Sequence, residues 1–166
     1  MTYSFQMLPK TLDQLKAMPE AALTDPAAVA ALCVAALCVY PENKDEAIQM
    51  INYLKGPQPL SVYETQFIRD RFMDGKDYLP RSYFAGATPQ NNYAPTMPYT
   101  ICVEENPYSR AQLAEGYLKL FVRSGGADSP REIKLRTKPS TGQWFIWEFG
   151  GILSGIRIPA ASDPWA

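Results

Sequence analysis

Residues 116–149 read GYLKLFVRSGGADSPREIKLRTKPSTGQWFIWEF, and this stretch decides the fold class of the chain. It contains three short segments with the character of strands, residues 117–123, 131–138 and 143–149, and apolar and polar residues alternate most clearly in the first two. Such alternation is typical of strands that bury one face and expose the other. The connections SGGADSP and PSTG are rich in turn-forming residues. The stretch therefore predicts three consecutive antiparallel strands.

The N-terminal half of the chain has the periodicity of helices instead. Asp25 provides a capping side chain, Pro26 is a favourable first helical residue, and residues 27–39 after them carry no charge. A helix that is apolar on all sides has to be surrounded by other elements. We expect it at the centre of the helical half, with the inner face of the sheet as an additional cover. Similar start and stop signals predict helices over residues 11–18, 43–56 and 61–73.

Together these patterns predict an α+β fold. We expect an N-terminal cluster of three to four helices packed with a C-terminal antiparallel sheet of about four strands, the first at residues 99–104. The chain divides into a helical half (1–78), a loop (79–98) and a sheet half (99–166) within one domain. At 166 residues with 46% apolar side chains, it can form a sizeable single core.

The composition excludes several kinds of site. The chain contains no histidine, which excludes Ser-His-Asp and Cys-His catalysis, histidine-ligated zinc and histidine-based pH sensing. Its three cysteines, Cys33, Cys38 and Cys102, form no CxxC pair, so we interpret them as small buried hydrophobes in a reducing compartment. No run of carboxylates matches a calcium loop or a catalytic pair. We therefore predict no metal, no cofactor and no catalytic residue.

Alternation also assigns side chains to the two faces of the predicted sheet. In the last segment we expect Phe145 and Trp147 to face inward and Trp144 to face outward. The outward set combines cations with aromatic rings, a composition that single-stranded nucleic acid binders use. The commoner alternative is a solvated face held by cross-strand charge and cation–π pairs. The candidate binding residues on this face are Tyr117, Lys119, Arg123, Lys134, Arg136 and Trp144.

The segment between residues 79 and 99 shows neither helical nor strand periodicity. Loops of this length in a compact domain are usually functional or packed on themselves. The aromatic residues of the segment indicate that it packs onto the rest of the protein. Tyr83 and Tyr93 are further candidate binding residues because they belong to this loop.

Two shorter segments admit a structural and a functional interpretation. The glycine pair Gly125-Gly126 could hold a phosphate with backbone N–H groups, but no helix and no phosphate-binding motif follows, so we expect a hairpin connection. Trp165 is expected to anchor the end of the chain on the core, and a partner-binding tail is the alternative.

The distribution of charge and apolar residues bears on location and partners. The first residues lack the basic and apolar regions of a signal peptide, and the apolar run 26–40 is shorter than the ~20 residues that cross a bilayer. We expect a cytoplasmic protein without membrane association. Residues 1–109 are net negative and residues 110–166 net positive. We interpret this difference as attraction between the two halves, with steering of an acidic partner as the alternative.

Three stretches of unusual sequence carry a family resemblance. They are LPRSYFAGATPQNNYAP (79–95), GGADSPREIKLRTKPSTGQWFIWEF (125–149) and DPWA (163–166). They resemble a family of uncharacterised bacterial proteins of about this length, a domain of unknown function. The resemblance covers most of the chain and implies no activity, cofactor or site residue. It implies that the loop, the SGGADSPR turn and the DPWA end belong to one unit, which favours a single integrated domain.

From these observations we expect a non-catalytic, cytoplasmic protein-binding module that uses the loop 79–99 and the outer face of the sheet. The first alternative is the binding of single-stranded nucleic acid or another anionic ligand through the basic and aromatic residues of that face. The second is an enzyme that uses carboxylates near the same loop, such as Glu104 and Glu105. A protein partner is favoured over nucleic acid because the whole chain is slightly acidic, with a net charge of −1.

Overall fold

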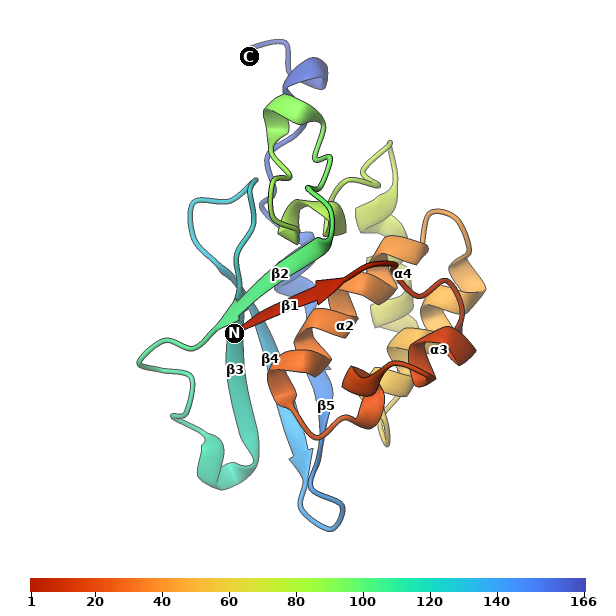
Figure 1. Ribbon diagram of the computed structural model, residues 1–166, viewed down its shortest axis with the longest axis vertical. Coiled ribbons are helices and arrows are strands. Elements are labelled where there is room, and N and C mark those ends of the chain that lie inside the picture. Colours follow the sequence, from red (N-terminus) through yellow and green to blue (C-terminus); the bar gives the residue numbers. More distant parts are fainter.

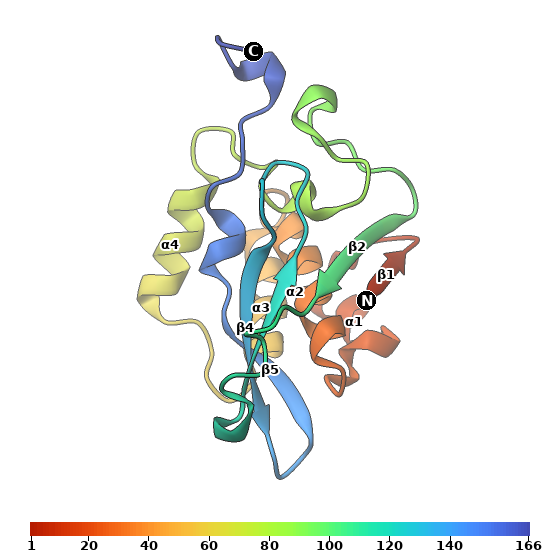
Figure 2. The same ribbon diagram turned by 90° about the vertical axis from the view of Figure 1, so that its left-hand side faces the viewer.

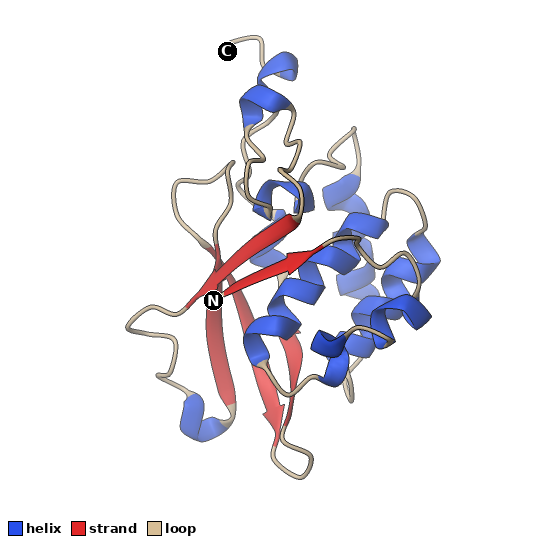
Figure 3. Ribbon diagram, viewed as in Figure 1, coloured by secondary structure: helices blue, strands red, loops and turns tan.

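The computed structural model describes residues 1–166 as four α-helices and one antiparallel sheet of five strands (Figures 1 and 3). The α+β class with an N-terminal helical part and a C-terminal sheet is thereby confirmed. No helix has the length and apolar character needed to cross a membrane. The helices are α1 (Leu12–Lys16), α2 (Pro26–Val39), α3 (Lys44–Lys55) and α4 (Val62–Phe72). The strands are β1 (Thr2–Phe5), β2 (Tyr99–Glu104), β3 (Tyr117–Val122), β4 (Arg131–Lys138) and β5 (Gln143–Glu148).

Helix α2 lies at the centre of the molecule, between the sheet and the other helices (Figure 1). Asp25 starts it, because its carboxylate accepts a hydrogen bond from the N–H of Ala27 at 3.0 Å. Leu32, Cys33 and Val34 point in three directions around the helix, and none of them is exposed. Every side of the helix is therefore covered, which confirms the prediction of a central helix surrounded by other elements.

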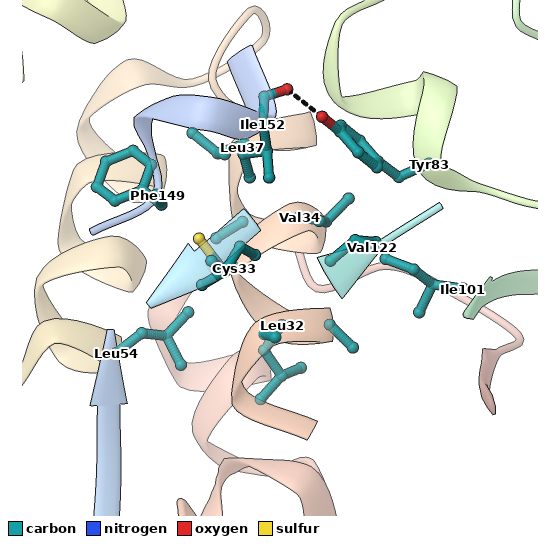
Figure 4. Packing of buried hydrophobic residues seen from close by; sticks show 14 of the residues in the cluster. Leu32, Cys33, Val34, Leu37, Leu54, Tyr83, Ile101, Val122, Phe149 and Ile152 are labelled. Atoms are coloured by element: carbon teal, nitrogen blue, oxygen red, sulfur yellow. Dashed lines mark hydrogen bonds between the residues drawn. The ribbon is translucent and has the colours of Figure 1, made fainter. Parts of the chain in front are cut away.

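The cover of α2 comes from both the sheet and the helices. Figure 4 shows Val34 on the side of α2 toward Val122 and Ile101, which belong to the sheet. Cys33 lies on the side toward Leu54 of α3 and Phe149, which follows β5. The sheet curls around the helix, and its inner face supplies the additional cover that the sequence predicted.

The fifth strand, β1, is not predicted by the sequence patterns. It pairs antiparallel with β2, with Tyr3 opposite Ile101, and forms one edge of a sheet with the order β1-β2-β3-β4-β5. Only Phe5 of its residues is buried. Its four residues alternate small polar and aromatic side chains, but a segment of four residues is too short for this pattern to identify a strand, and its pairing depends on residues far along the chain. The sheet consequently has one strand more than expected.

The side chains of β5 are oriented differently from the prediction. Ile146 lies opposite Leu135 of β4, and both are buried toward α2. Trp144 lies opposite Thr137 on this inner face, whereas Trp147 lies on the outer face. The strand carries large apolar side chains on both faces, so alternation alone does not distinguish the two orientations. The pairing with β4, which contains a bulge, decides between them.

The segment between α4 and β2 packs against the core, as predicted. The hydroxyl of Tyr83 donates a hydrogen bond to the carbonyl of Ile152 at 2.6 Å (Figure 4). The hydroxyl of Tyr93 donates one to the carbonyl of Arg157. Both rings are buried, so neither side chain can contact a partner. The structure therefore removes Tyr83 and Tyr93 from the candidate binding residues.

The glycine-rich turn between β3 and β4 is a packed hairpin connection. The N–H of Gly125 donates to the carbonyl of Ser82 at 2.8 Å, and the N–H of Gly126 donates to Ser124 Oγ at 3.1 Å. Because both glycine N–H groups have acceptors within the protein, they are not available to hold a phosphate. A Cβ atom at Gly125 would lie 1.9 Å from the carbonyl oxygen of Ala87. Close packing against the preceding loop thus requires glycine here.

The C-terminal segment projects from the domain (Figure 1). Trp165 is 93% exposed, so the expectation that it anchors the end of the chain on the core is wrong. The last buried residue is Pro159, and every residue after it is exposed or half-buried.

Candidate functional site

The candidate site lies on the side of β3, β4 and β5 that faces away from α2, which we term the outer face. In Figure 2 strands β3 and β4 lie in front of α2 and α3, so this face is turned toward the viewer. Alternation predicted it correctly in β3 and β4, where Leu118 and Leu135 are buried while Lys119 and Lys134 are partly exposed. The outer face comprises Tyr117, Lys119, Phe121, Arg123, Glu132, Lys134, Arg136, Lys138, Phe145, Trp147 and Glu148.

Four of these side chains form a cation–aromatic cluster. Lys134 Nζ lies 4.7 Å from the ring centroid of Tyr117. Arg136 Cζ lies 5.4 Å from the same centroid and 4.8 Å from that of Trp147. The two rings meet edge to face with their centroids 5.7 Å apart. The structure thus brings together three predicted residues, Tyr117, Lys134 and Arg136, and adds Trp147, which the sequence analysis had assigned to the interior.

Most cations of the outer face have no acidic partner. Arg123 is the exception, because its Nε lies 3.0 Å from Glu104 Oε2, at the opposite end of β3 from Tyr117. Lys119 lies directly opposite Lys134 across the paired strands. Like charges in this position repel each other, and the repulsion falls when an anion binds between them. No ion pair is formed by Lys119, Lys134, Arg136 or Lys138.

A groove with a volume of about 380 Å³ lies beside the cluster, where the turn after α3 meets the hairpin between β4 and β5. We term it the basic groove, because three cations and no carboxylate line it. Gly56 (φ +63°) brings the turn against the strand, since a Cβ atom there would lie 2.3 Å from Phe145 Cδ1. The lining consists of Lys55, Pro57, Gln58, Arg136, Thr137, Lys138, Pro139, Phe145, Ile146 and Trp147.

A second groove, of about 390 Å³, lies between α4 and the opposite ends of the same two strands. Figure 2 shows α4 on one side of β4 and α1 on the other. We term it the acidic groove, because three carboxylates and no cation line it. Neither Glu132 nor Glu148 forms an ion pair. The lining consists of Tyr63, Glu64, Phe67, Glu132, Glu148, Phe149, Gly150 and Gly151.

An ion pair separates the two grooves. Lys55 Nζ lies 3.2 Å from Glu64 Oε2 and donates a second hydrogen bond to the carbonyl of Trp147 at 3.4 Å. Glu64 Oε1 accepts a hydrogen bond from the N–H of Ser61 at 3.0 Å, as part of the capping box of α4. Burial acts to raise the pKa of Glu64, but the Ser61 hydrogen bond and the Lys55 charge outweigh it and hold this pKa below its usual value.

The carboxylates near the loop 79–99 are not arranged as a catalytic pair. Glu104 is bonded to Arg123, and Glu105 accepts two hydrogen bonds from Arg110, at 2.7 and 3.1 Å. The hydrogen bond from Arg110 lowers the pKa of Glu105, which makes this carboxylate a weaker base. No group of three or more acidic or cysteine side chains is placed to hold a metal ion. This geometry gives no support to a carboxylate enzyme at the loop.

Family comparison shows which part of the chain contains these features. The family described as "Domain of unknown function (DUF6935)" matches residues 7–160. The chain belongs to this family. The predicted membership in a family of unknown function is thus confirmed, and both grooves lie inside the DUF6935 match, whereas β1 and Trp165 lie outside it. No curated protein and no solved structure matches the chain.

The basic groove and the acidic groove were both missed by sequence reasoning. Each of them joins residues of β4 and β5 to residues of the α3–α4 region, which lie far apart in the chain. The alternating cations of β4 were the one usable signal. They indicated a charged face, but the local pattern contains no information about the helical residues that meet it.

Proposed function

We propose that this DUF6935 protein is a non-catalytic protein-binding module of the bacterial cytoplasm. Its outer face and basic groove bind a protein partner whose contact surface carries carboxylates. The thiols of its three cysteines are free, which agrees with a reducing compartment. The observation that carries the proposal is a set of four cations without ion-pair partners, Lys119, Lys134, Arg136 and Lys138. They lie on or beside a groove with apolar walls.

Charge complementarity supports an acidic partner. A carboxylate placed between Lys119 and Lys134 would relieve their repulsion across the strands. Arg136 and Lys138 border the groove and are exposed, so they can steer an acidic surface toward it. The walls formed by Phe145 and the neighbouring prolines suit apolar side chains that flank such carboxylates.

A protein partner fits this surface better than single-stranded nucleic acid does. Base stacking needs a free aromatic face and contributes ~1–3 kcal/mol per base. The ring of Tyr117 is already in contact with Lys134 and Arg136, and Arg136 also lies over Trp147. Trp144, the other stacking candidate, is on the inner face of the sheet. The outer face therefore offers charge for phosphates, while the rings of its cation–aromatic cluster are already in contact with cations.

The proposal is tested with a fluorescein-labelled oligoglutamate peptide that contains leucine, with binding followed by fluorescence anisotropy. We expect binding that weakens with added salt. Arg136→Glu should weaken it by about tenfold or more, corresponding to ~1.4 kcal/mol. Lys10→Glu is the matched control, because it makes the same kind of charge reversal at an exposed residue near α1.

Two results would overturn the proposal. One is an equal effect of Arg136→Glu and Lys10→Glu, since the interaction would then depend on net charge and not on the outer face. The other is tighter binding of an oligothymidylate of the same net charge than of the peptide. That result would favour the nucleic-acid alternative.

A further inference from the structure

We infer that the protein partner of the outer face is a second copy of this chain. The rim of the basic groove of each copy binds in the acidic groove of the other copy. This inference rests on the proposed function and names the partner. It starts from the opposite charge of two neighbouring grooves of nearly equal size, about 380 and 390 Å³. Apart from Lys55 and Glu64, which pair with each other, one groove is lined by two cations and no acid, and the other by two acids and no cation.

Both grooves open along the same pair of strands. On β4, Glu132 lines the acidic groove and Arg136 the basic groove. On β5 the corresponding residues are Glu148 and Trp147. The charge therefore changes from negative to positive along β4, and from negative to neutral along β5. A surface of this kind is complementary to itself when it is turned around.

A two-fold axis produces this complementarity. If the axis lies in the plane between two copies and passes between the grooves, the basic groove of each copy faces the acidic groove of the other. Each favourable contact then occurs twice, as between Arg136 of one copy and Glu148 of the other.

Apolar side chains near the acidic groove add to the argument. Val62 and Tyr63, in the first turn of α4, are 77% and 76% exposed, and Tyr63 lines this groove. The basic groove has apolar walls in Pro57, Pro139 and Phe145. In the two-fold arrangement Tyr63, which lines the acidic groove, faces this apolar hollow of the second copy. Tyrosine in such a position is typical of interface centres.

The adjacent edge of the sheet is not available for another mode of association. On β5 the N–H of Trp144 donates to the carbonyl of Leu23 at 2.7 Å, and the carbonyl of Trp147 accepts from Lys55. These contacts occupy backbone groups with which a further strand would pair. Association at this end of the sheet therefore uses side chains of the outer face.

The test is a charge swap read by sedimentation equilibrium. One variant carries Arg136→Glu and Lys138→Glu, and the other carries Glu132→Lys and Glu148→Lys. We expect the wild type to dimerise in a way that weakens with salt, and each variant alone to remain monomeric because both of its grooves have one sign. An equimolar mixture of the two variants should form a heterodimer, since both contacts are again between opposite charges. Thermal unfolding followed by circular dichroism checks that each variant is folded.

The inference is overturned if the wild type is monomeric at every concentration and salt, or if the mixture does not associate. The oligoglutamate assay on the same variants separates this failure from failure of the proposed function. The variant with Glu132→Lys and Glu148→Lys should bind the peptide more tightly than the wild type, because it keeps the cations of the basic groove and adds cations to the outer face, while the other variant loses peptide binding. That pattern without dimerisation would leave the proposed function standing and remove the second copy as the partner.

Discussion

Lys55 Nζ and Glu64 Oε2 are 3.2 Å apart, with the lysine side chain 3% exposed and the glutamate side chain 30% exposed. The lysine side chain is therefore much more deeply buried than its glutamate partner. Loss of the carboxylate leaves a buried ammonium with only the carbonyl of Trp147 as acceptor. Loss of the ammonium leaves a carboxylate that water can reach. The pair also joins the last residue of α3 to the first turn of α4, between the two grooves.

We expect Glu64→Gln to reduce the free energy of unfolding by about 2 kcal/mol, less than for a fully buried pair because Glu64 is partly exposed to water. Lys55→Met should cost less, about 1 kcal/mol or below, because no buried charge remains. Urea denaturation at neutral pH measures both. Asp70→Asn, in the exposed pair with Arg69, is the control and should change little. A larger loss for Lys55→Met than for Glu64→Gln would contradict this account.

The loss of folding stability at low pH should depend on Glu64. Its pKa is lower in the folded protein than in the unfolded chain, so its ionised form stabilises the fold. This contribution is complete above the unfolded pKa of about 4.3 and is lost as the pH falls through the lower folded pKa. Stability of Glu64→Gln should therefore fall less steeply than that of the wild type below about pH 4. Parallel curves for the two proteins over this range would show that Glu64 has no such role.

Tyr83→Phe should destabilise the protein by about 1–2 kcal/mol. The substitution removes the hydroxyl that donates to the carbonyl of Ile152 at 2.6 Å and leaves that buried carbonyl without this donor. Tyr108→Phe makes the same chemical change at a side chain that is 73% exposed and should be nearly neutral. Thermal or urea unfolding of both variants makes the comparison. Equal effects would mean that the contact between the loop and the segment after β5 contributes nothing.

Gly125→Ala should destabilise the fold by about 2–3 kcal/mol or more, since the new Cβ atom would lie 1.9 Å from the backbone oxygen of Ala87. A backbone atom cannot rotate away as a side chain can. Gly142→Ala is the control, because its Cβ would meet nothing within 4 Å and only its positive φ of 71° opposes the change, by about 1 kcal/mol. Urea unfolding of the two variants provides the measurement. A milder effect at Gly125 than at Gly142 would show that the turn between β3 and β4 does not pack as described.

The elements that could be predicted are those whose signals are local. The start of α2 follows from Asp25, whose side chain accepts a hydrogen bond from the N–H of Ala27, two positions later. The inward side chains of β3 and β4 follow from alternation, because their outward neighbours, with the exception of Phe121, are polar or charged. Both kinds of signal depend on interactions within a few residues of the chain, and they do not require knowledge of the partner elements.

The candidate site was only partly predictable for the same reason. Lys134 and Arg136 were found because they alternate with buried residues in one strand. Trp147 was missed because β5 has large apolar side chains on both faces, and its orientation is decided by the register with β4. Tyr83 and Tyr93 were selected from a loop that turned out to be packed inside. An aromatic residue in a loop has no local feature that distinguishes a core contact from a binding contact.

The sequence by itself determined the α+β class, the buried central helix and the charged faces of β3 and β4, because each of these depends on local periodicity. The tertiary structure alone decided the addition of β1, the orientation of Trp144 and Trp147, and the separation of a basic from an acidic groove. These features arise where residues distant in the chain meet, as Lys55 of α3 meets the carbonyl of Trp147 in β5. Such contacts are set by the packing of whole elements, which no single segment encodes.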